Sequence, residues 1–203
     1  YLKTSYKRIC YYLYVFIDLY SRYVVGWLVD ESQTAELGQK LFEVSYHRQG
    51  IDTQNLILHS DRGTQMKAGS WSHLEKFLGV TRSFSRPRVS NDNPYIESSF
   101  KTLKFHPEYP SQFESIIDAR HYLKKYFAWY NNEHHHSGIC LLTPVDVHFN
   151  QANIKLNNRY LVIQDAYNRH PERFSVPPKR SVLPKEVWIN QPDGISVDGN
   201  ILM

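Results

Sequence analysis

Two apolar runs separated by a polar turn open the chain. The runs cover residues 11–17 and 23–29, and both are rich in the tyrosine and valine that favour strands. Residues 18–22 between them have the composition of a turn. The pattern predicts two adjacent antiparallel strands, and because both runs are almost continuously apolar, we expect helices to cover this sheet on both faces.

Beyond this hairpin, the spacing of apolar residues alternates between helical and strand-like periods. Ser32 or Thr34 can cap a helix that Gly50 ends. Five further segments follow, with strands predicted at 56–59 and 80–84 and helices predicted at 71–78, 94–103 and 115–130. A strand entered through a crossover helix adds to a sheet in parallel, so this order predicts an α/β fold with one mixed sheet flanked by helices.

The character of the chain changes after about residue 150. One helix is predicted at 157–168, prolines then break the chain into extended pieces, and residues 187–197 could form a small hairpin. The sequence therefore predicts a core domain over 1–150 and a small C-terminal extension over 151–203.

Composition narrows the class of protein. Of 203 residues, 41% are hydrophobic and 14% are aromatic, which is enough for a core and excludes global disorder. No run of about eighteen apolar residues is present, so no membrane helix is expected. Cys10 and Cys140 lie far apart without metal-binding spacing, which excludes a disulfide scaffold, argues against zinc and favours the reducing cytoplasm. The net charge of +4 permits a nucleic-acid partner without requiring one.

The most informative acidic residue is Asp61, which comes directly after a short apolar strand and two positions before Gly63. A carboxylate at the carboxyl end of a buried strand lies where open α/β sheets place their sites. Asp61 can also simply cap a turn. Taken alone, the segment leaves both interpretations open.

A second acidic residue, Glu97, lies near the start of the helix that follows the polar loop. Asn91 or Asp92 can cap this helix. Lys101 and Lys104 follow Glu97 at i+4 and i+7, on the same helical face. Such a face can be merely solvated, with a Glu–Lys pair worth roughly 0.2–0.5 kcal/mol. This segment alone therefore does not indicate a site.

Together, these segments resemble a known family. With 35 residues between Asp61 and Glu97 and a lysine seven positions after the glutamate, the chain resembles DDE transposases and retroviral integrases, specifically the integrase core of insertion-sequence transposases of the IS3 type. The stretches that carry the resemblance are Ile17–Trp27, His59–Gly63, Ser85–Ser98 and Trp129–His134. The resemblance covers about residues 1–150, and the region from His170 to Asn190 also looks like the family's C-terminal extension.

This resemblance implies a ribonuclease H-like fold on which three carboxylates hold two divalent metal ions, Mg²⁺ or Mn²⁺, for DNA strand cleavage and transfer. Carried over by position, Asp61 is the second carboxylate and Glu97 is the third. Paired metals activate the attacking oxygen and stabilise the leaving oxygen of such a displacement. Carboxylate oxygens suit these hard ions, and nothing here offers the thiolate or imidazole set that selects zinc.

The resemblance places the first carboxylate in a Trp-x-x-Asp-Ile/Phe-Thr stretch immediately before a segment like Tyr1-Leu2-Lys3. We therefore expect the first catalytic aspartate just upstream of Tyr1, in a longer chain. A two-metal site is then expected only in the full-length protein. The 203 residues alone should be inactive, or nearly so, in DNA strand transfer. Asp18 is the less favoured candidate, because its counterpart in the family lies in a hairpin turn, where an aspartate bonds its own backbone.

The resemblance also implies contacts with DNA. Lys104 matches the basic residue that the family carries after the glutamate. Further side chains beside the site are candidates for contacts with DNA, namely Lys101, Arg62, Arg86, Arg88, Asn91 and Asn93. The arginines can also be merely solvated, and Asn91 can serve only as a helix cap. The three consecutive histidines from His134 to His136 are predicted to be surface or helix-end structure and not a metal site.

The partners implied by the resemblance are transposon-end DNA, target DNA and further copies of the chain assembled on DNA in a prokaryotic cytoplasm, with no membrane. The alternative is a non-catalytic DNA-binding or multimerisation module from a truncated or decayed gene. A ribonuclease H-type nuclease is disfavoured by the long C-terminal extension. An in-frame Asp-Ile-Thr or Asp-Phe-Thr directly before Tyr1 would favour the enzyme, and a stop codon there would favour the alternative.

Overall fold

The fold is described from a computed structural model of the chain. The structure describes the residues numbered 1–51, 56–61, 63, 71, 76–87 and 92–189. Packing divides the chain into two units. The first unit contains residues 1–18 and 24–126, and the second contains residues 19–23 and 127–203. The predicted boundary between a core over 1–150 and an extension over 151–203 stays a prediction.

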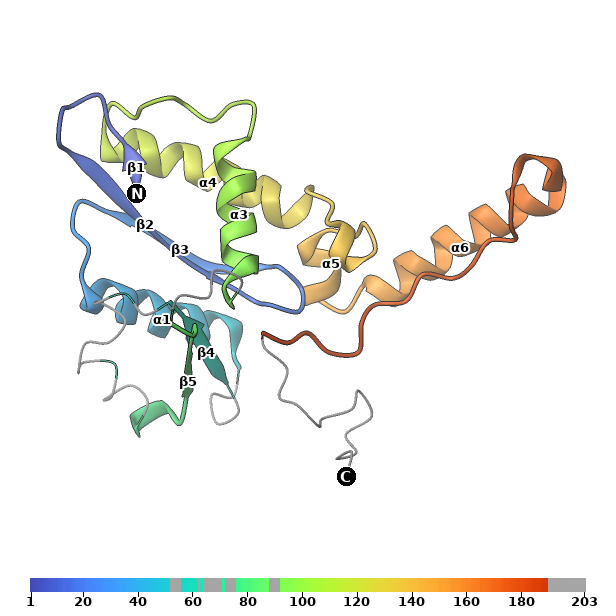
Figure 1. Ribbon diagram of the computed structural model, residues 1–203, viewed down its shortest axis with the longest axis horizontal. Helices are drawn as coiled ribbons and strands as arrows, with labels where there is room; N and C mark the ends of the chain where they lie inside the picture. The colour runs from blue at the N-terminus through green and yellow to red at the C-terminus, as the bar shows by residue number, and fades with distance from the viewer. Residues whose placement is uncertain (52–55, 62, 64–70, 72–75, 88–91, 190–203) are drawn as a thin grey trace. The chain divides into compact units, whose positions relative to one another are not determined.

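A three-stranded antiparallel sheet forms the start of the first unit (Figure 1). Its order is β1 (Leu2–Lys3), β2 (Cys10–Ile17) and β3 (Val24–Asp30). The β2–β3 pairing runs from Tyr12 opposite Asp30 to Ile17 opposite Val24, which confirms the predicted hairpin. The sequence pattern did not predict β1, because two residues are too few to show a period.

The remaining strands, β4 (Ile57–Ser60) and β5 (Thr81–Phe84), pair in parallel with each other, as their crossover connection predicts. They form a separate two-stranded sheet, so the expectation of one continuous sheet is wrong for the described residues. The backbone at the end of β1 pairs with Phe113 instead. The Phe113 N–H donates to the Lys3 carbonyl at 2.9 Å, and the Ser5 N–H donates to the Phe113 carbonyl at 3.1 Å.

Helix α1 (Ala35–Gln49) packs on β2 and β3 (Figure 1). Thr34 caps it by accepting the Leu37 N–H at 3.3 Å, and Gly50 ends it in the left-handed conformation with φ of 60°. Both ends agree with the sequence prediction. Among the described residues, the helix contributes Ala35 and Phe42 to a buried cluster that also contains Trp71 and Val80.

Two more helices of the chain, α3 (Pro94–Lys104) and α4 (Ile116–Asn132), confirm the helices predicted at 94–103 and 115–130. Trp71 and residues 76–78 are also helical, and the positions between them lie outside the described residues. The segment between α3 and α4 packs through edge-to-face aromatic pairs of Tyr109 with Phe113 and with Tyr122. No helix in the described part of the chain has both the length and the apolar character that a membrane span needs.

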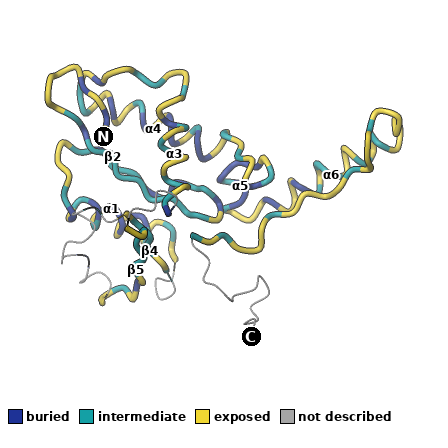
Figure 2. Tube along the Cα trace, viewed as in Figure 1, coloured by how far each residue is buried: buried dark blue, intermediate teal, exposed yellow. Residues whose placement is uncertain are grey.

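The second unit contains α5 (Pro144–His148) and α6 (Ala152–Arg169). The latter begins five residues earlier than predicted, because Ala152 and Leu156 are buried in a cluster with Val147. Most of α6 beyond Leu156 is exposed or half-buried (Figure 2).

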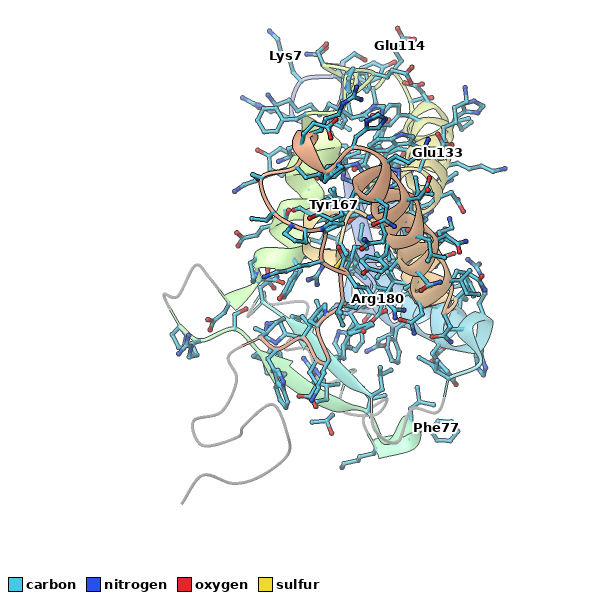
Figure 3. All side chains as sticks on the ribbon, turned by 90° about the vertical axis from the view of Figure 1, so that its right-hand side faces the viewer. Lys7, Phe77, Glu114, Glu133, Tyr167 and Arg180 are labelled. Carbon is cyan, nitrogen blue, oxygen red and sulfur yellow. The ribbon has the colours of Figure 1, made fainter. Side chains whose placement is uncertain are left out.

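The C-terminal end of α6 is stabilised by an aromatic contact. Tyr167, labelled in Figure 3, packs edge to face on Phe174, and the ring centroids are 5.4 Å apart. The hairpin predicted at 187–197 is not observed in its first part, since residues 187–189 form no strand. The rest of that hairpin lies outside the described residues.

Candidate active site

Asp61 lies directly after β4 and is exposed. Its Oδ1 accepts the backbone N–H of Gly63 at 3.0 Å, so the turn-capping interpretation of this residue is observed. A carboxylate has a second oxygen, Oδ2, and capping with one oxygen is compatible with metal binding by the other. The role of Asp61 as a metal ligand stays a prediction.

Glu97 lies in the first turn of α3 and is also exposed. Its N–H donates to the Asn93 carbonyl at 3.2 Å, and Pro94 occupies the first helical position. The N-cap is Asn93, which makes no side-chain capping bond. The prediction that Asn91 or Asp92 caps this helix is therefore wrong, because the helix begins later and the Asp92 carboxylate binds elsewhere.

Lys101 and Lys104 lie on the exposed face of α3, one and two turns after Glu97, whereas Ser99 and Leu103 are buried on the opposite side. This confirms the predicted arrangement of one carboxylate and two ammonium groups along a single face. The face has the charge that contact with a phosphate backbone requires.

The most extensively bonded carboxylate in this region belongs to Asp92, which is 0% exposed. The Arg86 backbone N–H and Nε donate to its Oδ2 at 2.7 and 2.9 Å, and Arg86 Nη2 donates to its Oδ1 at 2.9 Å. These hydrogen bonds and the charge of Asp92 raise the pKa of the Arg86 guanidinium. Arg86, predicted to contact DNA, therefore makes an intramolecular ion pair.

His59, in β4, connects this ion pair to the sheet. Its Nε2 lies 2.9 Å from the Asp92 carbonyl oxygen, and its Nδ1 lies 3.0 Å from Ser83 Oγ, on β5. Because a carbonyl can only accept, Nε2 must carry the proton, so Nδ1 accepts from the Ser83 hydroxyl when the ring is neutral. Both ring nitrogens are thus bonded within the protein, which leaves carboxylate oxygens as the donors available to a metal here. That donor set fits Mg²⁺.

These contacts join the segment that carries Asp61 to the segment that carries Glu97. His59 is two residues before Asp61, and Asp92 is one residue before the cap of α3. Among the described residues, no three His, Cys, Asp or Glu side chains gather as a metal-binding group. The structure thus links the segments of Asp61 and Glu97, and the metal-binding roles of both carboxylates stay predictions.

The remaining residues that the sequence predicted for the site are one acidic residue, Asp18, and four candidates for DNA contacts. Asp18 lies directly after β2, where the chain enters the turn to β3, as the hairpin-turn interpretation predicts. Asn93 is half-buried at the start of α3. Three predicted DNA-binding residues lie outside the described residues, namely Arg62, Arg88 and Asn91. The sequence did not reveal the role of Asp92, because only folding brings Arg86 and His59 to it.

In the second unit, the histidine tract follows α4, as expected of helix-end structure. The His136 ring lies 5.0 Å from the Tyr130 ring and 4.4 Å from the His134 ring, measured between centroids. Burial, together with the nearby charges of His134, Arg22 and His135, lowers the pKa of His136 from 6.5 to about 4. The folded protein therefore favours the neutral ring.

We expect this histidine to make folding pH-dependent. Because the folded pKa of about 4 is below the unfolded value of 6.5, the stabilisation is complete above pH 6.5 and is lost as the pH falls towards 4. Urea unfolding at several pH values should show that His136→Gln removes part of this loss. His170→Gln, which changes an exposed histidine, is the control. An unchanged pH profile in His136→Gln would rule out this assignment.

Comparison with known proteins relates this chain to a family. Two family models, each described as "Integrase core domain", match residues 1–90 and 78–144. The transposase for insertion sequence element IS904 of Lactococcus lactis subsp. lactis (strain IL1403) is 31% identical over 136 residues, covering 66% of this chain and 53% of the relative. Transposase InsF for insertion sequence IS3A of Escherichia coli (strain K12) is 31% identical over 134 residues, covering 66% and 46%. The chain spans about half the length of the curated relatives it matches.

One solved structure has a fold similar to that of this chain. A chain of the simian T-cell lymphotropic virus intasome in complex with PP2A regulatory subunit B56 gamma has a TM-score of 0.57 and 16% sequence identity, covering 70% of this chain and 50% of that chain. This likeness supports the predicted ribonuclease H-like α/β class. With the family models together matching residues 1–144, the chain belongs to the integrase core domain family and resembles the transposases of insertion sequences.

Proposed function

We propose that this chain is the catalytic core of a DNA transposase, which cuts and joins DNA strands with the help of divalent metal ions. The observation that carries the proposal is the linkage of Asp61 and Glu97 through the His59–Asp92 hydrogen bond, in a chain of the integrase core domain family. Asp61 stands at the carboxyl end of a strand, where α/β sheets place their sites.

In this proposal, Asp61 and Glu97 would hold Mg²⁺ or Mn²⁺. The metal ions supply Lewis acidity at the attacking and leaving oxygens of the phosphodiester. Glu97 is held at its backbone by the first turn of α3, and the Asp61 carboxylate is held by its Oδ1, which accepts the Gly63 N–H. We expect the first of the three carboxylates in the coding sequence that precedes Tyr1, as the family resemblance implies, with Asp18 as the less favoured candidate.

The coding sequence upstream of Tyr1 tests the proposal against its alternative, a non-catalytic DNA-binding or multimerisation module. An in-frame Asp-Ile-Thr or Asp-Phe-Thr is the expected finding. A stop codon or an unrelated sequence would contradict the enzyme and support the alternative. The family membership and the two exposed carboxylates favour the enzyme.

We also propose that DNA contacts this core mainly through phosphates, with the multimer assembled on paired DNA ends. Lys101 and Lys104 lie on the Glu97 face of α3, which places two positive charges beside the carboxylate. Asn93, Arg62, Arg88 and Asn91 remain candidates for further contacts.

Lys104→Ala is expected to weaken DNA binding to a similar extent for all sequences and to reduce the slope of log K against log salt by about 1, because one phosphate contact is lost. Fluorescence anisotropy with duplexes of unrelated sequence, at several salt concentrations, measures this slope. Lys124→Ala, which changes an exposed lysine of α4, should leave the slope unchanged. Equal slopes for Lys104→Ala and the unmodified chain would exclude the contact.

A further inference from the structure

We propose that Arg86, Asp92 and His59 form a positioning clamp that holds the start of α3, and with it Glu97, at the carboxyl end of β4, next to Asp61. The inference rests on the proposed function, because it assigns positioning roles for the same site. None of the three residues is proposed to touch the metal ions or the DNA.

The first part of the clamp is the buried carboxylate of Asp92. Its side chain is 0% exposed, whereas that of Arg86 is 61% exposed. A buried carboxylate is stable only when its charge is paired and its oxygens accept hydrogen bonds. Arg86 Nε and Nη2 donate to the two oxygens at 2.9 Å each, in the forked geometry that only an arginine offers, and the Arg86 backbone N–H adds a bond at 2.7 Å. Asp92 is therefore fixed relative to Arg86, just beyond the end of β5.

The second part is the hydrogen bond between His59 and the Asp92 backbone. His59 lies opposite Ser83 in the β4–β5 register and also bonds to its side chain at 3.0 Å. The same ring reaches the Asp92 carbonyl at 2.9 Å through Nε2. The Ser85 N–H donates to the Ser60 carbonyl at 3.0 Å and extends the parallel pairing past the strands. The two strand ends and Asp92 are thus held in one hydrogen-bonded network.

The start of α3 connects this network to the candidate metal ligands. Asn93, the residue after Asp92, is the cap of α3, and its carbonyl accepts the Glu97 N–H at 3.2 Å. Because a helix is rigid over one turn, the position of Asp92 sets the position of Glu97. Asp61 lies two residues after His59, so the network anchors both carboxylates. Metal sites demand such support, since ligands have to be held within about 0.5 Å of the productive geometry.

The clamp differs in its consequences from the phosphate contact that the sequence predicts for Arg86. A phosphate contact contributes to the salt dependence of DNA binding. A positioning residue instead changes the order of α3 and the metal requirement of the site. The two roles are therefore separable by measurement.

Two variants and one matched control form the experiment. Asp92→Asn keeps the shape of the side chain and removes its charge, and Arg86→Lys keeps the charge and removes the fork. The control is Asp146→Asn in the second unit, because Asp146 is also a buried carboxylate, bonded to Lys155 at 2.6 Å. All three changes should lower the stability of folding. Only the two clamp variants should affect the site.

The first readout is hydrogen exchange of the 203-residue chain. In Asp92→Asn and Arg86→Lys, the amides of residues 97–100, the first in α3 with helical acceptors, should exchange faster by about tenfold or more, relative to those of α1, because hydrogen bonds to a charged group are lost. In Asp146→Asn, exchange at 97–100 should stay as in the unmodified chain. If Asp92→Asn does not fold, Arg86→Lys alone decides, since it retains a cation beside the buried carboxylate.

The second readout is the Mn²⁺ concentration that half-saturates DNA cleavage by the protein translated from the complete reading frame. It should rise by about tenfold in the clamp variants, with the salt slope of DNA binding unchanged. Two results would overturn the clamp. One is exchange at 97–100 in the clamp variants that is no faster than in Asp146→Asn, and the other is a lower salt slope of DNA binding with an unchanged Mn²⁺ requirement. Faster exchange in a protein that never cleaves DNA would support the clamp and refute the proposed function instead.

Discussion

Asp61→Asn and Glu97→Gln are each expected to lower the rate of Mg²⁺-dependent DNA cleavage about a thousandfold or more, because each change removes a charged metal ligand whose contribution is several kcal/mol. Asparagine can still accept the Gly63 N–H that Asp61 Oδ1 accepts at 3.0 Å, so the turn should persist. The rate is measured on duplexes that carry a transposon end, with the protein translated from the complete reading frame.

The control for this experiment is Glu133→Gln, which changes an exposed carboxylate of the second unit. It should cleave DNA at the unmodified rate. Unfolding temperatures of all the variants should stay close together, since both candidate ligands are exposed. Asp61→Asn or Glu97→Gln with more than about a tenth of the normal rate would contradict their role as metal ligands, because the loss would then be below 1.4 kcal/mol.

Phe42→Ala is expected to produce the largest loss of stability, about 3–5 kcal/mol, because it opens a cavity in the core of the first unit. Phe42 is 5% exposed and packs against Phe16, Tyr46 and Trp71, with ring centroids 5.7, 5.8 and 6.4 Å away. These contacts join α1 to β2 and to the residues before β5. Urea unfolding followed by tryptophan fluorescence measures the loss.

Phe77→Ala provides the matched comparison, because Phe77 is 79% exposed and its side chain lies at the edge of the ribbon (Figure 3). The same chemical change there should alter the free energy of unfolding by no more than about 0.5 kcal/mol. Similar losses for Phe42→Ala and Phe77→Ala would show that the core is not where the structure places it.

Local signals explain why much of the fold could be predicted. The β2–β3 hairpin follows from two strand-like runs and a turn, and α1 follows from its period, with Thr34 and Gly50 at its ends. Each of these features depends on neighbours within a few residues, and such neighbours are visible in a sequence. The predicted helices near α3 and α4 were correct for the same reason.

Features that depend on distant residues could not be predicted in this way. The pairing of Phe113 with the chain at the end of β1 joins segments more than a hundred residues apart, and it accompanies the division of the strands into two sheets. The early start of α6 depends on burial of Ala152 against α5, which no period reveals.

The candidate site also depends on residues that are distant in the sequence, so its contacts could not be predicted from local patterns. Asp61 and Glu97 were identified through the family resemblance, since spacing alone left each with an ordinary structural role. The pairing of Arg86 with Asp92 had no sequence signal beyond an acidic residue after a basic loop. An arginine near a predicted DNA site is expected to contact phosphate, because the two have opposite charges. Only the folded structure shows that Arg86 binds the buried carboxylate of Asp92 instead.

Anomalous diffraction from crystals of the complete reading-frame protein, soaked in Mn²⁺, tests the central claim most directly. We predict a manganese peak with carboxylate oxygens of Asp61 and Glu97 both at about 2 Å, and loss of that peak in Asp61→Asn. Manganese bound to neither carboxylate, or bound to one with the other turned away, would contradict the claim that these two residues form one metal site.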